Sequence, residues 1–117
     1  MTDRPAPRRE LERIRDGGGP GAEQAGLALS GGTASDRLRA AVLALAFARG
    51  ADRSTCPSDA ARAVAEDWRP LLPQARELAR ELGRTGQVQL TQRGRPLDPD
   101  AEWTGPIRIR ASRPADG

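Results

Sequence analysis

The spacing of apolar residues changes at Gly86, and this change restricts what the chain can fold into. Up to Gly86, apolar residues recur every three or four positions, as they do on one face of a helix. After Gly86, Val88 and Leu90 alternate with polar residues, which is typical of a strand with one buried face. The chain is therefore predicted to form helices first and a β-hairpin after them.

The first predicted helix covers residues 36–49. Thr33 and Asp36 have the spacing of a capping pair, and an acidic residue stabilises the positive end of the helix dipole. Gly50 is a natural end, because glycine readily takes the conformation that follows the last turn of a helix. The apolar stripe of this helix consists of Leu38, Ala41, Val42, Leu45 and Ala46.

Two further helices are predicted over residues 57–66 and 73–84, with a loose helical turn at Trp68–Leu72 between them. Proline suits the first position of a helix, so Pro57 and Pro73 are the expected starts. Prolines at 70 and 73 cannot both lie inside a helix, because each lacks an N–H and clashes with the preceding turn. The buried stripe of the last helix is predicted to consist of Ala75, Leu78, Ala79 and Leu82.

A β-hairpin is predicted over residues 87–111. Its turn is expected at Arg93–Gly94, because glycine takes positive φ readily, and it has two or three strands depending on whether Arg95–Leu97 pairs. The connector 53–55 is a candidate for the small first strand that winged helices often carry. These elements predict an α+β winged helix over residues 34–111, with a three-helix helix-turn-helix core followed by a β-hairpin wing.

Residues 1–33 are rich in glycine, proline and alanine and poor in large apolar residues. Such a segment buries too little apolar surface to offset the entropy lost on ordering, so a disordered N-terminal tail is predicted. Within it, residues 7–15 are expected to form at most a transient helix. The alternative is a peptide arm that touches a partner. Residues 112–117 are expected to be a frayed C-terminus.

The chain contains no histidine and no lysine, which removes most catalytic arrangements. Without these residues there is no Ser-His-Asp triad, Cys-His dyad, P-loop or Schiff base. One cysteine and no histidine also make a zinc site implausible. We therefore expect a protein that is not an enzyme, with no catalytic residues, no metal and no cofactor.

Cys56 is the single cysteine, so an intrachain disulfide is excluded and a reducing compartment fits. No run of about 18 apolar residues is available for a transmembrane helix. The N-terminus lacks the basic-then-apolar order of a signal peptide. A cytoplasmic protein with no membrane contact is expected.

Two side chains each have two interpretations. Cys56 lies at a helix start, where a lowered thiol pKa would make it a redox-sensitive switch, but free cysteine is most often a small buried apolar residue. Trp68 is expected to fill the gap between the second and third helices, the alternative being that it stacks on a ligand.

The sequence also resembles a family of small, uncharacterised bacterial proteins that carry a domain of unknown function. The resemblance spans about residues 37–110, with Leu72 standing where relatives often have methionine, a swap that cores tolerate. It implies a winged-helix-like fold and carries no activity with it. The matching residues are Cys56-Pro57-Ser58, Ala61-Arg62, Trp68-Arg69, Pro73, Arg76, Gly86, Thr91-Gln92, Gly94 and Gly105-Pro106-Ile107-Arg108-Ile109-Arg110.

All 19 basic residues are arginine and 16 residues are acidic, so the net charge of +3 does not by itself imply nucleic acid. The placement of arginines is more informative. The third helix of a helix-turn-helix protein normally enters the major groove, where arginine and glutamine suit base edges and phosphates. The candidate nucleic-acid-binding residues are Arg69, Gln74, Arg76, Arg80 and Arg84 near or on that helix, and Arg93, Arg95, Arg108 and Arg110 on the hairpin.

The leading prediction is a small DNA-binding module or regulator that places its third helix in the groove of double-stranded DNA and its arginine-bearing wing on phosphates. The alternative is a protein-interaction winged helix that makes no nucleic-acid contact. Glu77 and Glu81 are spaced to pair with Arg80 and Arg84, which would leave little net positive charge on the helix.

Overall fold

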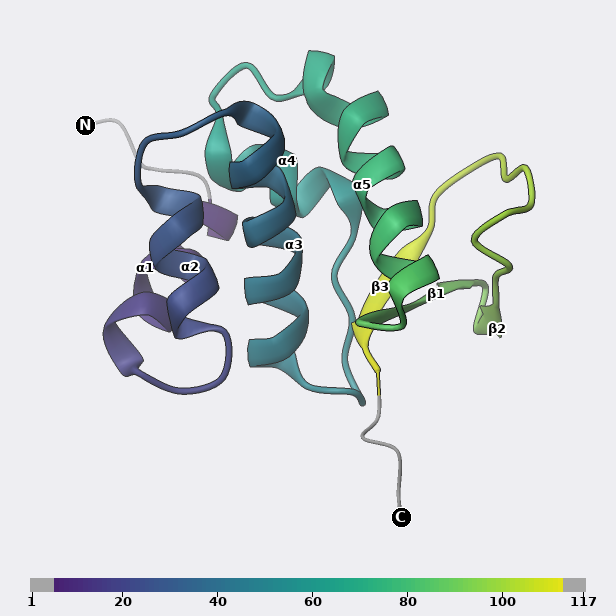
Figure 1. Ribbon diagram of the computed structural model, residues 1–117, viewed down its shortest axis with the longest axis horizontal. Coiled ribbons are helices and arrows are strands. Elements are labelled where there is room, and N and C mark those ends of the chain that lie inside the picture. Colours follow the sequence, from purple (N-terminus) through teal and green to yellow (C-terminus); the bar gives the residue numbers. More distant parts are fainter. Residues whose placement is uncertain (1–5, 113–117) are drawn as a thin grey trace.

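The computed structural model describes residues 6–112 of the chain (Figure 1). Over these residues the fold is α+β, with helices preceding a three-stranded antiparallel sheet, an arrangement compatible with a winged helix. The elements, in chain order, are α1 (Ala6–Gly17), α2 (Ala22–Leu29), α3 (Ala34–Arg49), α4 (Pro57–Val64), the 3-10 turn η1 (Arg69–Leu71), α5 (Leu72–Thr85), β1 (Val88–Gln92), β2 (Arg95–Pro96) and β3 (Arg108–Ala111).

Helix α3 is the central element of the core. It packs against α1 and α2 on one side and against α4, α5 and β3 on the other (Figure 1). The predicted capping pair is confirmed, since the Thr33 hydroxyl accepts a hydrogen bond of 3.0 Å from the backbone N–H of Asp36, and the helix begins at Ala34, two residues before the predicted start. Its end at Gly50 is also confirmed, with φ of 79°. The predicted apolar stripe is fully buried.

The prediction of a disordered N-terminal tail is wrong for the part of it that the structure describes. Helices α1 and α2 pack on each other and on α3, and Leu11 is completely buried between them. Residues 1–5 lie outside the described residues. The prediction failed because a segment rich in alanine and glycine has few large apolar side chains, yet these small residues allow helices to approach closely.

Gly21 makes this close approach possible. It has φ of 86°, and a Cβ atom built on it would lie only 2.7 Å from the carbonyl oxygen of Ala44 on α3. Any side chain here would therefore force α2 away from α3. Ala25 and Ala28 continue the contact along α2 and are fully buried.

Helices α4 and α5 lie within two residues of the ranges predicted for them. The expected turn between them is the 3-10 helix η1, and Pro57 occupies the first position of α4. Helix α5 begins one residue before Pro73 and ends at Gly86, whose φ is 82°. All four residues of its predicted buried stripe are buried.

The sheet has the strand order β2-β1-β3. Strand β1 pairs with β3 with Leu90 opposite Ile109, and the pairing of Arg95–Pro96 with β1 makes the third strand. The predicted turn at Arg93–Gly94 is a two-residue loop in which both residues have positive φ, 54° and 81°. Thr55 forms an isolated bridge with Ile109 through backbone bonds of 2.7 and 2.8 Å, so the connector 53–55 contributes one residue to the sheet edge.

The C-terminal residue that the structure describes, Ser112, donates its backbone N–H to Gln87 at 3.3 Å. The frayed end predicted beyond it, residues 113–117, lies outside the described residues. Over the described part of the chain, no helix has the length and apolar character needed to cross a membrane.

Candidate nucleic-acid interface

Arg80 of α5 is turned onto the loop between β2 and β3, residues 97–107, which we call the wing loop. Its Nη1 donates to the backbone carbonyls of Pro99 and Ala101, the latter at 2.8 Å. Its guanidinium also lies 4.1 Å from the centre of the Trp103 ring, within the range of a cation–π contact. Trp103 is fixed in turn, because its indole N–H donates to the carbonyl of Asp98 at 2.9 Å. Arg80 therefore anchors the wing loop to α5.

The two other predicted arginines of α5 make similar contacts. Arg76 donates to the carbonyl of Gly105 at 3.1 Å and lies 5.8 Å from the Trp103 ring. Arg84 forms an ion pair of 2.5 Å with Asp100. The structure thus brings Arg76, Arg80 and Arg84 together along one edge of α5, with the wing loop as their partner.

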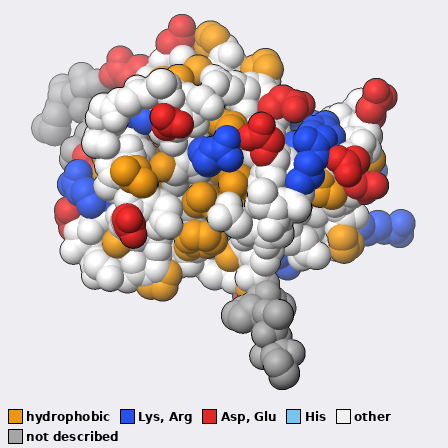
Figure 2. Space-filling view, viewed as in Figure 1, with side chains coloured by type: hydrophobic (Ala, Val, Ile, Leu, Met, Phe, Trp, Pro, Cys, Tyr) orange, Lys and Arg blue, Asp and Glu red, His pale blue; other side chains and the backbone are white. Residues whose placement is uncertain are grey.

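The exposed face of α5 carries Gln74, Glu77 and Glu81. Glu77 lies 3.4 Å from the Nε of Arg80, and Glu81 pairs with Arg39 of α3 at 2.9 Å. Figure 2 shows basic and acidic side chains interspersed on the face of the molecule that includes α5. A continuous positive surface is not present on this face.

The predicted arginines of the hairpin have different surroundings. Arg93 and Arg95, at the turn and on β2, are exposed and have no partner among the described residues. Arg108 on β3 donates from Nε to the hydroxyl of Ser54 at 2.9 Å and from Nη2 to its carbonyl at 3.0 Å. Arg110 is half-buried, and its Nε is a buried nitrogen with no hydrogen-bond partner.

Arg69, the remaining predicted arginine, lies over the face of Trp68 with 4.6 Å between its guanidinium carbon and the ring centre. Arg62 lies near the same ring at 5.8 Å. Trp68 itself is half-buried and packs against the core.

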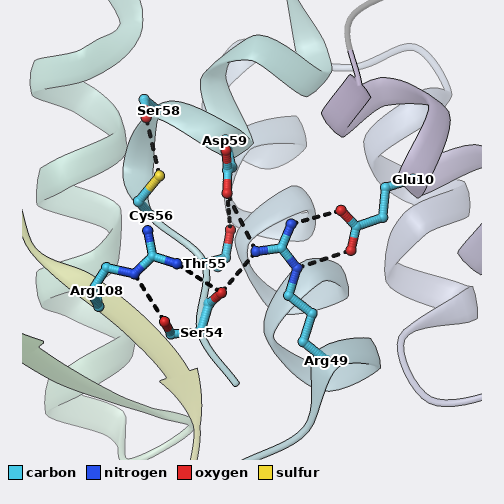
Figure 3. A network of polar contacts seen from close by, with 8 residues as sticks. All are labelled: Glu10, Arg49, Ser54, Thr55, Cys56, Ser58, Asp59 and Arg108. Atoms are coloured by element: carbon cyan, nitrogen blue, oxygen red, sulfur yellow. Dashed lines mark hydrogen bonds and ion pairs between the residues drawn. The ribbon is translucent and has the colours of Figure 1, made fainter. Parts of the chain in front are cut away.

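Sequence reasoning missed a polar network centred on Arg49, the last residue of α3 (Figure 3). Arg49 binds both carboxylate oxygens of Glu10 on α1, at 2.6 and 2.9 Å, and the carbonyl of Ser54 at 2.8 Å. The hydrogen bond with Glu10 raises the pKa of Arg49 above its ordinary value. No sequence signal could have found this pair, because its two residues are 39 positions apart and the segment of Glu10 was predicted to be disordered.

The network continues through Asp59 to the edge of the sheet. Asp59 lies 3.4 Å from Arg49 and accepts a bond of 3.0 Å from the hydroxyl of Thr55, whose backbone bridges to Ile109. One set of hydrogen bonds thus connects α1, α3, α4 and β3.

A hollow of about 260 Å³ lies between the start of α4, α5 and the end of the wing loop. Cys56 lines it and is partly exposed, with its Sγ 3.1 Å from the hydroxyl of Ser58. The lining residues are Cys56, Pro57, Ser58, Leu72, Arg76, Pro106, Ile107 and Arg108. No group of three or more His, Cys, Asp or Glu side chains positioned to hold a metal ion occurs within residues 6–112.

Helices α3 to α5 and the sheet form a small α+β domain to which an N-terminal helical pair is added. Residues 35–112 match the family described as "Protein of unknown function (DUF3253)", and the match covers more than half of the chain. The chain therefore belongs to this family, as its resemblance to a family of unknown function implied, and α1 and α2 precede the matched range. A comparison with curated proteins finds no match.

Proposed function

We propose that this protein is a winged-helix module that binds a protein partner and does not read duplex DNA with α5. The order of elements supports the winged helix: α3, the bridging residue Thr55, α4, α5, and then β1 and β3 joined through a wing. Within that fold, α5 is the helix that would enter a DNA groove.

The observation that carries the proposal is the internal use of the α5 arginines. Arg80 contacts two carbonyls and an aromatic ring, Arg76 contacts a carbonyl, and Arg84 contacts a carboxylate. A hydrogen bond to a charged group contributes about 1.5–3 kcal/mol net where it is shielded from water, so releasing Arg80 from Pro99 would have a substantial cost. The exposed contacts of Arg76 and Arg84 add less, at most about 1 kcal/mol each. DNA would also have to displace the wing loop from the edge of α5.

The exposed charges around α5 also favour a protein partner over duplex DNA. Glu77 and Glu81 project from its outer face, and the wing loop adds the exposed acidic residues Asp98, Asp100 and Glu102. Carboxylates in these positions would meet the phosphates of a duplex as like charges, and the arginines paired with Glu77, Glu81 and Asp100 offset part of this repulsion. A protein partner can complement such a surface with its own basic residues.

One observation favours DNA as a second candidate. Arg93 and Arg95 are exposed at the tip of the hairpin, without partners among the described residues, where the wing of a DNA-bound domain would meet phosphates. Two such contacts would give weak binding whose affinity falls with salt with a logarithmic slope of about −2, since each phosphate contributes about −0.9.

The test is a salt titration of duplex binding by the full chain. We expect no binding beyond this weak contact, and we expect the double variant Arg93→Gln, Arg95→Gln to remove it. Glu77→Gln serves as the matched variant on α5 and should leave the salt slope unchanged. A salt dependence of the affinity with a logarithmic slope much steeper than −2, which becomes shallower in Arg80→Ala, would contradict the proposal. It would indicate that α5 binds in the groove of the duplex.

A further inference from the structure

The hollow beside Cys56 has an unusual balance of charge. Arg76 of α5 and Arg108 of β3 both line it, and none of its lining residues is acidic. The rest of its wall is largely apolar, formed by Pro57, Leu72 and Ile107 among others. Two arginines from different elements therefore line one small hollow.

The contacts of these two arginines are all with neutral groups. Arg76 meets the Gly105 carbonyl and the Trp103 ring, and Arg108 meets the hydroxyl and the carbonyl of Ser54. By contrast, Arg49, Arg80 and Arg84 each lie within 3.4 Å of a carboxylate oxygen. The two charges at the hollow thus have no counter-ion among the described residues.

The nearest acidic residue in the sequence does not fill this role. Asp59 follows Ser58 in α4, but its carboxylate is held by Thr55 and Arg49 on the side of the network (Figure 3). The same view shows the guanidinium of Arg108 beside Cys56. Bonds to Ser54 hold this guanidinium in place through its Nε and Nη2, and leave Nη1 without a hydrogen-bond partner among the described residues.

We infer that this hollow binds a small molecule through an oxyanion, a carboxylate or a phosphate group, held between Arg76 and Arg108. Guanidinium groups match the planar geometry and charge of both oxyanions. The apolar wall takes the rest of the ligand. The volume of about 260 Å³ lies below the roughly 300–1,000 Å³ of pockets for drug-sized ligands, so the ligand is small. This inference is independent of the proposed function.

Cys56 offers a direct test, because it is the only cysteine of the chain and lines the hollow. The rates of its alkylation by iodoacetate, an anion, and by iodoacetamide, its neutral counterpart, are compared with those of N-acetylcysteine amide. We expect the iodoacetate-to-iodoacetamide ratio to be several-fold higher in the protein than in the free thiol. Arg108→Gln should lower the ratio, and Arg108→Lys, which keeps the charge, should retain most of it.

Arg13→Gln is the matched control, since Arg13 is exposed on α1 and the variant loses the same net charge. Its ratio should equal that of the unmodified protein. Far-ultraviolet circular dichroism and tryptophan emission establish that each variant is folded. An equal loss in Arg108→Gln and Arg108→Lys, a ratio equal to that of the free thiol, or no reaction of Cys56 with either reagent would overturn the inference.

The class of ligand is determined by testing which anion protects Cys56 from alkylation by iodoacetamide. Because this reagent is neutral, added anions do not slow it by screening its attraction to the arginines. Propionate, inorganic phosphate and chloride are compared at equal ionic strength. Protection by propionate alone assigns a carboxylate ligand, and protection by phosphate alone assigns a phosphate ligand. Either protection should disappear in Arg108→Gln. Equal protection by chloride, or none by any of the three anions, would contradict a built oxyanion site.

Discussion

Among the arginines of α5, Arg80 makes the most extensive contact with the wing loop. Its side chain is only 18% exposed, and it meets two carbonyl oxygens and the face of Trp103. Its neighbour Arg84 is 49% exposed and makes one ion pair. Because water screens an exposed pair far more than a covered one, the two arginines differ in what they contribute to stability.

We predict that Arg80→Ala lowers the free energy of unfolding by about 2–4 kcal/mol, since it removes a partly buried charged hydrogen bond to Pro99 and the cation–π contact with Trp103. Arg84→Ala is the matched variant and should cost at most about 1 kcal/mol, as exposed ion pairs do. Urea denaturation followed by tryptophan fluorescence measures both. Equal losses in the two variants would mean that the wing loop is held by other contacts.

At the scale of elements, the N-terminal helical pair depends on how closely α2 can approach α3. Gly21 and Gly18 both have positive φ, 86° and 70°, so both would be strained by a side chain. The two glycines differ in the space available for a side chain. A Cβ at Gly21 would lie 2.7 Å from the carbonyl oxygen of Ala44, whereas nothing lies within 4 Å of a Cβ at Gly18.

Gly18→Ala should therefore cost only backbone strain, about 1–2 kcal/mol. Gly21→Ala should cost this amount and, in addition, the displacement of α2, which overpacking data put at about 1–3 kcal/mol. Hydrogen exchange is expected to speed up in α1 and α2 for Gly21→Ala alone. If α1 and α2 were equally protected from hydrogen exchange in Gly18→Ala and Gly21→Ala, α2 would not be closely packed on α3.

These elements also show what the sequence could and could not predict. Periodicity and end signals at Thr33, Gly50 and Gly86 located α3 and α5, because such signals act within a few residues of the helix they delimit. Helices α1 and α2 were missed because their burial depends on contacts with α3, which composition does not reveal. From its composition alone, a segment rich in alanine and glycine is predicted to be disordered, because composition does not show the surface on which it packs.

The candidate site was likewise predicted from the sequence only in part. The sequence singled out Arg76 and Arg108, but only the fold shows that they line one hollow and that Arg80 and Arg84 are held by the wing loop. Trp103 was not predicted to take part, since no local pattern connects it with α5. Spacing along a helix identifies which residues share an edge. It does not predict which residues of a distant loop contact that edge.

At the scale of the whole molecule, the N-terminal pair and the domain form one body. The radius of gyration is 13.4 Å, which matches the relation of about 2.2N^0.38 Å for a compact domain of this length. The face around α5 therefore belongs to a compact unit, and its exposed carboxylates, Glu77, Glu81 and those of the wing loop, lie among basic side chains (Figure 2).

If this face binds a protein, a photo-crosslinking residue in place of Glu77 should form a protease-sensitive, nuclease-resistant adduct in cells of the source organism. The same residue in place of Glu23, exposed on α2, is the control and should not form that adduct. The adduct should be reproduced with the purified partner, identified by mass spectrometry, and lost in the double variant Glu77→Arg, Glu81→Arg. A nuclease-sensitive adduct, or equal adducts from both positions, would contradict a protein-binding face at α5.

The ion pair between Glu10 and Arg49 has a consequence for biosynthesis. Helix α1 leaves the ribosome before α3 and α4, yet the guanidinium that holds it and three elements that it packs on, α2, α3 and α4, are translated later. A helix of 12 residues is marginally stable by itself in water, so α1 has to remain an unsettled segment while α3 and α4 are made. A helix that is synthesised before its packing partners thus becomes ordered only after they have been made.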